Sequence, residues 1–105
     1  MGADYFQVEA TGRDAFVAFN NAVADATEYF GTQNYTGSIK EKPGFYMVPC
    51  DEGIEAAMKK IDELTMKYDN TGNYSGNLEC FEKWSRCACI KIGKGRYIFF
   101  GMASS

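Results

Sequence analysis

The chain has 105 residues and a formal net charge of −3, which fits one domain over residues 1–105 and argues against the basic surface of a nucleic-acid-binding protein. Hydrophobic residues make up 46% and aromatic residues 15% of the sequence, enough for a packed core with aromatic side chains left for the surface or an interface. No apolar run reaches the roughly 20 residues of a membrane helix, and no signal-peptide pattern is visible, so we expect a cytoplasmic protein with no membrane partner.

The first half of the chain predicts a strand, a helix and two more strands. Residues 5–10 (YFQVEA) read as a short strand, and Thr11 as the N-cap of the helix that follows. Residues 36–42 (TGSIKEK) and 45–48 (FYMV) predict two strands joined by a Pro-Gly turn. The apolar stripe of the helix is expected at Phe16, Phe19, Val23, Ala26 and Phe30.

The second half predicts a longer helix and a closing hairpin. Asp51 is a candidate N-cap, residues 69–77 are loop by composition, and residues 78–84 are a connection with a short strand. Residues 87–102 read as a hairpin with a Gly-Lys-Gly turn, and its second arm is apolar on both faces, as in a central strand. The helix has the clearest apolar stripe of the sequence: Ile54, Ala57, Met58, Ile61, Leu64, Thr65 and Tyr68.

A faint internal repeat suggests how these elements combine. Asn-Tyr-Thr-Gly at 34–37 follows the first helix, Asn-Tyr-Ser-Gly at 73–76 follows the second, and the two apolar stripes superpose at one offset. Two β-α-β units predict an α+β fold, with both helices on one face of the sheet. The expected architecture is a two-layer sandwich, split-βαβ-like with a C-terminal hairpin, with a mainly antiparallel sheet of about five strands. Chance similarity of the two loops is an equally good explanation of the repeat.

The sequence offers no catalytic or metal-binding motif. It contains no histidine, which excludes Ser-His-Asp and Cys-His catalysis and every metal site with a His ligand. Cys50, Cys80, Cys87 and Cys89 lack the C-x₂-C spacing of a zinc site, and we interpret them as reduced structural thiols. Cys87 and Cys89 would point to the same face of a strand. We therefore predict no enzymatic activity, no cofactor and no metal.

Acidic and aromatic residues are the candidates for contact with a protein partner. The first helix carries an acidic stripe suited to a basic partner, and loop aromatics among Asn, Ser and Gly are good interface anchors. The split-βαβ arrangement would bring the two Asn-Tyr loops together, with the tryptophan nearby. The alternative, which we favour slightly, is that these aromatics close the open end of the core. The predicted partner-binding residues are Asp14, Asp25, Glu28, Tyr35, Tyr74 and Trp84.

Two stretches resemble small uncharacterised proteins of bacteriophages and mobile elements. They are TGSIKEKPGF at 36–45 and EKWSRCACIKIGKGRYIFFGMASS at 82–105. In that group a GYTGTI-EK-GF stretch precedes a KWGP stretch and a YLFFGWAS end. Here Ser85-Arg86 replaces Gly-Pro and Met102 replaces Trp. The resemblance covers less than half of the chain and implies a phage-borne origin, and small acidic phage proteins include inhibitors of host defence such as anti-CRISPR proteins.

These observations predict a non-enzymatic protein-binding module and, as a hypothesis, a phage-borne inhibitor or modulator of a host protein such as a CRISPR or other defence effector. One alternative is a small-ligand or nucleotide-binding domain with a pocket between helices and sheet. The other is a self-assembling structural protein. A thermal-shift screen with nucleotides separates the first two readings, because a bound ligand raises the melting temperature.

Overall fold

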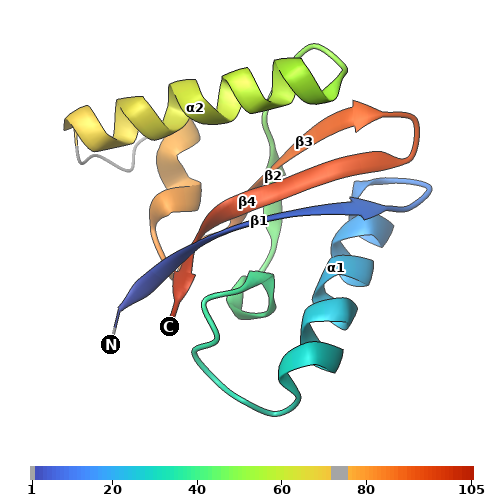
Figure 1. Ribbon diagram of the computed structural model, residues 1–105, viewed down its shortest axis with the longest axis vertical. Helices are drawn as coiled ribbons and strands as arrows, with labels where there is room; N and C mark the ends of the chain where they lie inside the picture. The colour runs from blue at the N-terminus through green and yellow to red at the C-terminus, as the bar shows by residue number, and fades with distance from the viewer. Residues whose placement is uncertain (1, 72–75) are drawn as a thin grey trace.

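The computed structural model, which describes residues 2–71 and 76–105, is an α+β fold with two helices and a four-stranded mixed sheet (Figure 1). The strands are β1 (Ala3–Thr11), β2 (Phe45–Met47), β3 (Cys87–Gly93) and β4 (Arg96–Ser104). Their order is β1-β4-β3-β2, with β4 antiparallel to both neighbours and β3 parallel to β2. The predicted class and C-terminal hairpin are confirmed, but the sheet has four strands, fewer than predicted.

Strand β4 is a central strand because both of its faces are apolar. Tyr97 and Phe99 belong to one buried cluster, and Ile98 and Phe100 belong to a second cluster on the opposite face. Phe99 and Phe100 are both fully buried. The alternation predicted for this arm of the hairpin is therefore confirmed, and β4 divides the core into two halves.

Helices α1 (Ala15–Phe30) and α2 (Ile54–Thr71) cover opposite faces of the sheet (Figure 1). Residues of α1 pack in the cluster of Phe99, and residues of α2 pack in the cluster of Phe100. The expectation that both helices share one face is therefore wrong. The connection from β1 to β2 runs across the sheet in one direction, and the connection from β2 to β3 runs back in the other. Both connections join parallel strands and are expected to be right-handed. Two right-handed connections that run in opposite directions place their helices on opposite faces of the sheet.

Helix α1 begins three residues later than predicted, and its contact with the sheet is centred on two alanines that the predicted stripe left out. Asp14, not Thr11, is the N-cap, and its Oδ1 accepts a hydrogen bond of 2.9 Å from the backbone N of Val17. Ala18 and Ala22 are the buried positions, and Phe19, Val23 and Ala26 of the predicted stripe pack beside them. Phe16 is 73% exposed. Small alanines let the helix axis approach the sheet closely, so the contact stripe is centred on them.

Helix α2 confirms the centre of its predicted stripe, since Ala57, Ile61 and Leu64 are all buried. Its first turn is different. Ala57 N donates to Gly53 O over 3.1 Å, so the helix begins after Gly53 and Asp51 is not its N-cap. Ile54 and Met58 were predicted in the core but are 48% and 37% exposed. The start of α2 therefore presents apolar side chains to solvent.

Two predicted strands are 3₁₀ turns in the structure. Within residues 36–42 the chain forms η1 (Ile39–Glu41), because Ser38 accepts a hydrogen bond from Lys40 N and Thr36 bonds to Glu41. Such side-chain bonds compete with the ladder of a sheet. Residues 78–84 contribute to η2 (Gly76–Phe81). Of the predicted loop at residues 69–77, residues 69–71 continue α2.

Candidate functional site

The structure brings Tyr35 and Trp84 together on the surface, as the loop argument expected. Their ring centroids are 6.3 Å apart in an edge-to-face arrangement, and both side chains remain about half exposed, at 49% and 54%. The Lys83 ammonium lies 5.6 Å from the centre of the Trp84 ring. Tyr74, the third predicted aromatic, lies outside the described residues. The exposed Tyr35–Trp84 pair is available to a partner.

The three predicted acidic residues have different roles. Asp14 caps α1 and lies 3.9 Å from the guanidinium of Arg13, so it is part of the helix start. Asp25 and Glu28 are exposed on the body of α1. Among the residues that the structure describes, these two form no ion pair. The acidic surface of α1 is therefore formed by Asp25 and Glu28.

A cavity of about 310 Å³ lies between α1, β1 and η1. Its apolar lining includes Val8 from the strand and Ala22 and Ala26 from the helix. Asp25 also lines it, together with Tyr29, whose side chain is 83% exposed. Sequence reasoning identified Asp25 but not Tyr29, although the spacing of four residues places both on the same side of a helix. The cavity thus combines an apolar interior with an acidic group and an exposed aromatic ring.

A larger hollow of about 730 Å³ lies beside α2 and the segment before it. Its lining carries charges of both signs, including Glu55 and Glu63 with Lys59 and Lys60. Lys60 and Glu63 form an ion pair of 3.7 Å between side chains that keep substantial exposure. Surface pairs of this kind contribute little binding or stability. This hollow therefore presents mixed charges and no large apolar side chain to a partner.

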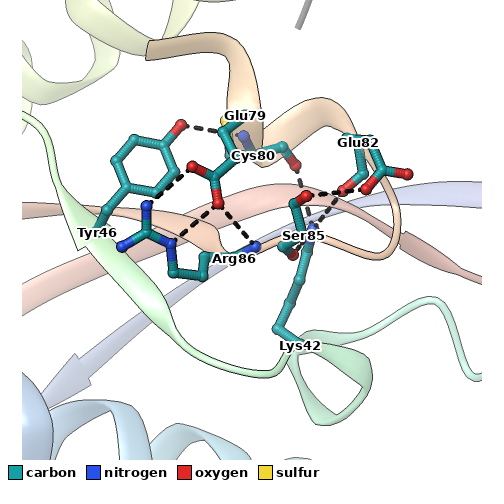
Figure 2. Close-up of polar contacts among 7 residues, drawn as sticks. All are labelled: Lys42, Tyr46, Glu79, Cys80, Glu82, Ser85 and Arg86. Carbon is teal, nitrogen blue, oxygen red and sulfur yellow. Dashed lines mark hydrogen bonds and ion pairs between the residues drawn. The ribbon is translucent and has the colours of Figure 1, made fainter. Parts of the chain in front are cut away.

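A buried lysine binds the backbone of the segment that contains Trp84, and Figure 2 shows its contacts with Cys80, Glu82 and Ser85. Lys42 is only 6% exposed, and its Nζ donates to the carbonyl oxygens of Cys80, Glu82 and Ser85 at 3.3, 3.1 and 2.9 Å. Burial lowers the pKa of the Lys42 ammonium. The Glu82 carboxylate also accepts a bond of 3.1 Å from the backbone N of Trp84. No sequence pattern marks a lysine that binds three carbonyls, and we did not predict it.

An adjacent ion pair completes the support of η2 (Figure 2). Arg86 binds the Glu79 carboxylate through Nε and Nη2, at 3.0 and 2.9 Å, and this bidentate contact lowers the pKa of Glu79. The Arg86 guanidinium lies 5.3 Å from the centre of the Tyr46 ring, and the Tyr46 hydroxyl accepts a bond of 3.0 Å from Cys80 N. The cluster positions a surface loop, and its polar groups bind one another.

Three of the four cysteines, Cys80, Cys87 and Cys89, are buried as structural thiols usually are, and Cys50 is half-buried. Cys87 and Cys89 are buried in the cluster of α1, on the same face of β3, as the two-residue spacing predicted. Burial raises the pKa of each to about 12, so both stay protonated at neutral pH. Within residues 2–71 and 76–105, no three metal-ligating side chains come together.

Over the same residues, no helix has the length and apolar character needed to cross a membrane. Comparison with known proteins finds no matching family model, no matching curated protein and no matching solved structure.

Proposed function

We propose that this chain is a non-enzymatic protein-binding module and that its partner contacts the side of α1 that flanks β1. The observation that carries the proposal is the cavity lined by Asp25 and Tyr29, beside an exposed acidic surface. Exposed tyrosines next to apolar pockets are typical anchors of protein interfaces, and a carboxylate at the rim speeds association with a basic partner.

The size of the cavity favours a protein partner over a small ligand. Its volume of about 310 Å³ is at the lower limit of the roughly 300–1,000 Å³ typical of drug-sized ligand sites. A single large side chain of a partner suits such a volume better than a nucleotide. A phosphate group would also lie close to Asp25, where two negative charges repel each other.

The biological role that we propose is modulation of a host protein, such as a CRISPR or other defence effector. The resemblance of residues 36–45 and 82–105 to phage proteins supports this role, together with the net charge of −3. The test is the plaquing efficiency of a targeted phage on bacteria that carry an active defence system and express this chain. The plaquing efficiency should be higher in cells that express the wild-type chain than in cells without it, and Asp25→Lys should remove this increase. Equal plaquing efficiency with and without the chain, for every defence system tested, would refute this role.

The contact surface itself is tested by photocrosslinking in such cells, with p-benzoylphenylalanine placed at Tyr29 or, as the matched control, at Lys59 on α2. Both positions are exposed. We expect a specific adduct from position 29 only, and its loss in an Asp25→Lys background. The same adducts from both positions would show that the α1 surface is not the contact.

A further inference from the structure

Strand β1 has an unpaired edge. Gly2 and Ser105 exchange two backbone hydrogen bonds, and Gly12 N donates to Gly95 O, so even-numbered residues of this segment bond to β4. The odd-numbered residues of β1 therefore direct their N–H and C=O groups away from the sheet. Of these outward groups, the Thr11 carbonyl accepts a bond of 2.9 Å from Asn21 Nδ2.

The other outward groups are unused. In the part of the chain that the structure describes, no hydrogen bond from another element reaches the backbone of Ala3, Tyr5, Gln7 or Glu9. Below we call the outward backbone groups of these four residues the β1 edge. A long unpaired edge without Pro or Lys is a ready template for another strand.

Apolar surface lies on both sides of the β1 edge. On the α1 side, the cavity is bordered by Val8 and Ala26. On the α2 side, Tyr5 is 43% exposed and Met58 is 37% exposed, and the Gln7 amide lies 3.5 Å from the Met58 sulfur. Successive side chains of an added strand would point to these two sides in turn. A strand with apolar residues would thus find contacts on both faces.

The charge next to the β1 edge selects the kind of strand. Asn21, Asp25 and Tyr29 follow one another at helical spacing along the side of α1, from the contact with Thr11 to the cavity. The Glu9 carboxylate is paired with Arg96, whereas Asp25 lines the cavity and forms no ion pair among the described residues. A basic side chain of the added strand would be attracted to it.

The same charge argues against a second copy of this chain as the occupant. Pairing of two β1 strands about a two-fold axis normal to the sheet would set two α1 helices side by side on one face. The Asp25 side of each helix would then face that of the other, and like charges in an interface are unfavourable.

We infer that the partner contributes an extended peptide strand that adds to the β1 edge, with an apolar side chain in the cavity and a Lys or Arg side chain beside Asp25. This inference rests on the proposed function, because it specifies the partner of the same surface. The backbone of β1 supplies the hydrogen bonds of the added strand, and the cavity and Asp25 supply its sequence preference.

The experiment is selection of a random peptide display library on the purified chain, followed by fluorescence anisotropy with the most enriched peptide. We expect enriched sequences that alternate apolar residues with others and include Lys or Arg. In an extended peptide, alternate amides point to opposite edges of the strand. N-methylation of every second amide on the edge that faces β1 should therefore abolish binding, and N-methylation of the intervening amides, on the other edge, should leave binding intact. This measurement uses the wild-type chain.

Variants of the chain test the same contact from the other side. Gln7→Pro removes an outward N–H and is compatible with an edge strand, so the Kd should rise about tenfold. Asp25→Lys should raise the Kd about three- to tenfold and weaken its salt dependence. Glu52→Lys, an equal charge reversal at an exposed position before α2, should leave the Kd unchanged.

Three results would overturn the inference. The first is a library that enriches no peptide, and the second is a peptide whose binding is insensitive both to Gln7→Pro and to the phase of methylation. The third is a concentration-dependent dimer, seen by analytical ultracentrifugation, that Gln7→Pro abolishes, because the edge would then take a second copy. If one of these three results is found and position 29 still crosslinks to a partner in cells, the proposed protein-binding function stands and only strand addition is rejected.

Discussion

Replacing Lys42 with Met should destabilise the protein by about 2 kcal/mol and loosen the segment around Trp84. The ammonium binds three carbonyl oxygens at 2.9 to 3.3 Å, and methionine preserves the length of the side chain but donates nothing. A buried acceptor that loses its partner costs about 1–3 kcal/mol. The Cys80 carbonyl lies in a buried contact, whereas those of Glu82 and Ser85 are partly accessible to water and would lose less.

An opposing effect reduces the net loss. The lowered pKa of Lys42 shows that burying the charge is unfavourable, and the variant recovers this cost. We therefore expect a net loss near 2 kcal/mol, which is about the cost of one orphaned carbonyl.

Urea denaturation measures this effect with two probes on the same samples. Far-UV circular dichroism reports the whole fold, and the fluorescence of Trp84, the single tryptophan, reports the segment that Lys42 holds. In Lys42→Met the fluorescence transition should come at lower urea than the dichroism transition. Lys91→Met, at an exposed position of β3, is the control and should change stability by less than about 0.5 kcal/mol. Equal stability of the two variants would refute the reasoning.

Three further predictions concern the core and the thiols. The free energy of unfolding should fall as the pH rises from 9.0 toward 12, because the thiols of Cys87 and Cys89 ionise in the unfolded chain while their pKa in the folded protein is about 12. The expected slope is about 1.4 kcal/mol per pH unit for each thiol. Denaturation of the wild type and of Cys89→Ala across this range should show a shallower slope for the variant. Ile61→Ala and Phe99→Ala should each cost about 2–5 kcal/mol in urea denaturation, and a surface-like loss in either would contradict its buried position. Chelator with reductant should leave the circular dichroism melt unchanged, and a large drop in the melting temperature would reveal a metal or disulfide contribution.

Periodicity was a reliable guide where large side chains alternate without interruption. The two-sided apolar pattern of residues 97–102 predicted a central strand, and Phe99 and Phe100 are indeed fully buried in it. In α1 the same reasoning was right only in part, because it ranked Phe above Ala. Phe19, Val23 and Ala26 pack against the core as predicted. Phe16 lies at the surface with its ring 5.1 Å from that of Phe45, while Ala18 and Ala22 make the close contact with the sheet.

Topology and polar contacts between distant segments were beyond the sequence pattern. Hydrophobic spacing showed that each helix has a core face, but not that the chain returns across the sheet between β2 and β3. Lys42 looked like the end of a strand, since nothing in residues 36–42 anticipates the carbonyls near residue 80 that bind it. Of the candidate site, Asp25 was predicted from its charge, whereas the unused β1 edge became visible only with the strand order.

The reciprocal bonds between Gly2 and Ser105 determine how the molecule responds to mechanical force. β1 and β4 are antiparallel partners in register from Ala3–Ser104 to Thr11–Arg96, so the two ends of the described chain leave the sheet side by side (Figure 1). Tension applied between these two ends pulls β1 away from β4 in an unzipping geometry, so that the hydrogen-bonded pairs break one after another. In a shear geometry all pairs would resist the force together. The first event would be the peeling of β1, which removes Phe6 from the core beneath α1. Pulling from this corner should therefore open the molecule at low force, in the order in which the strand pairs are reached.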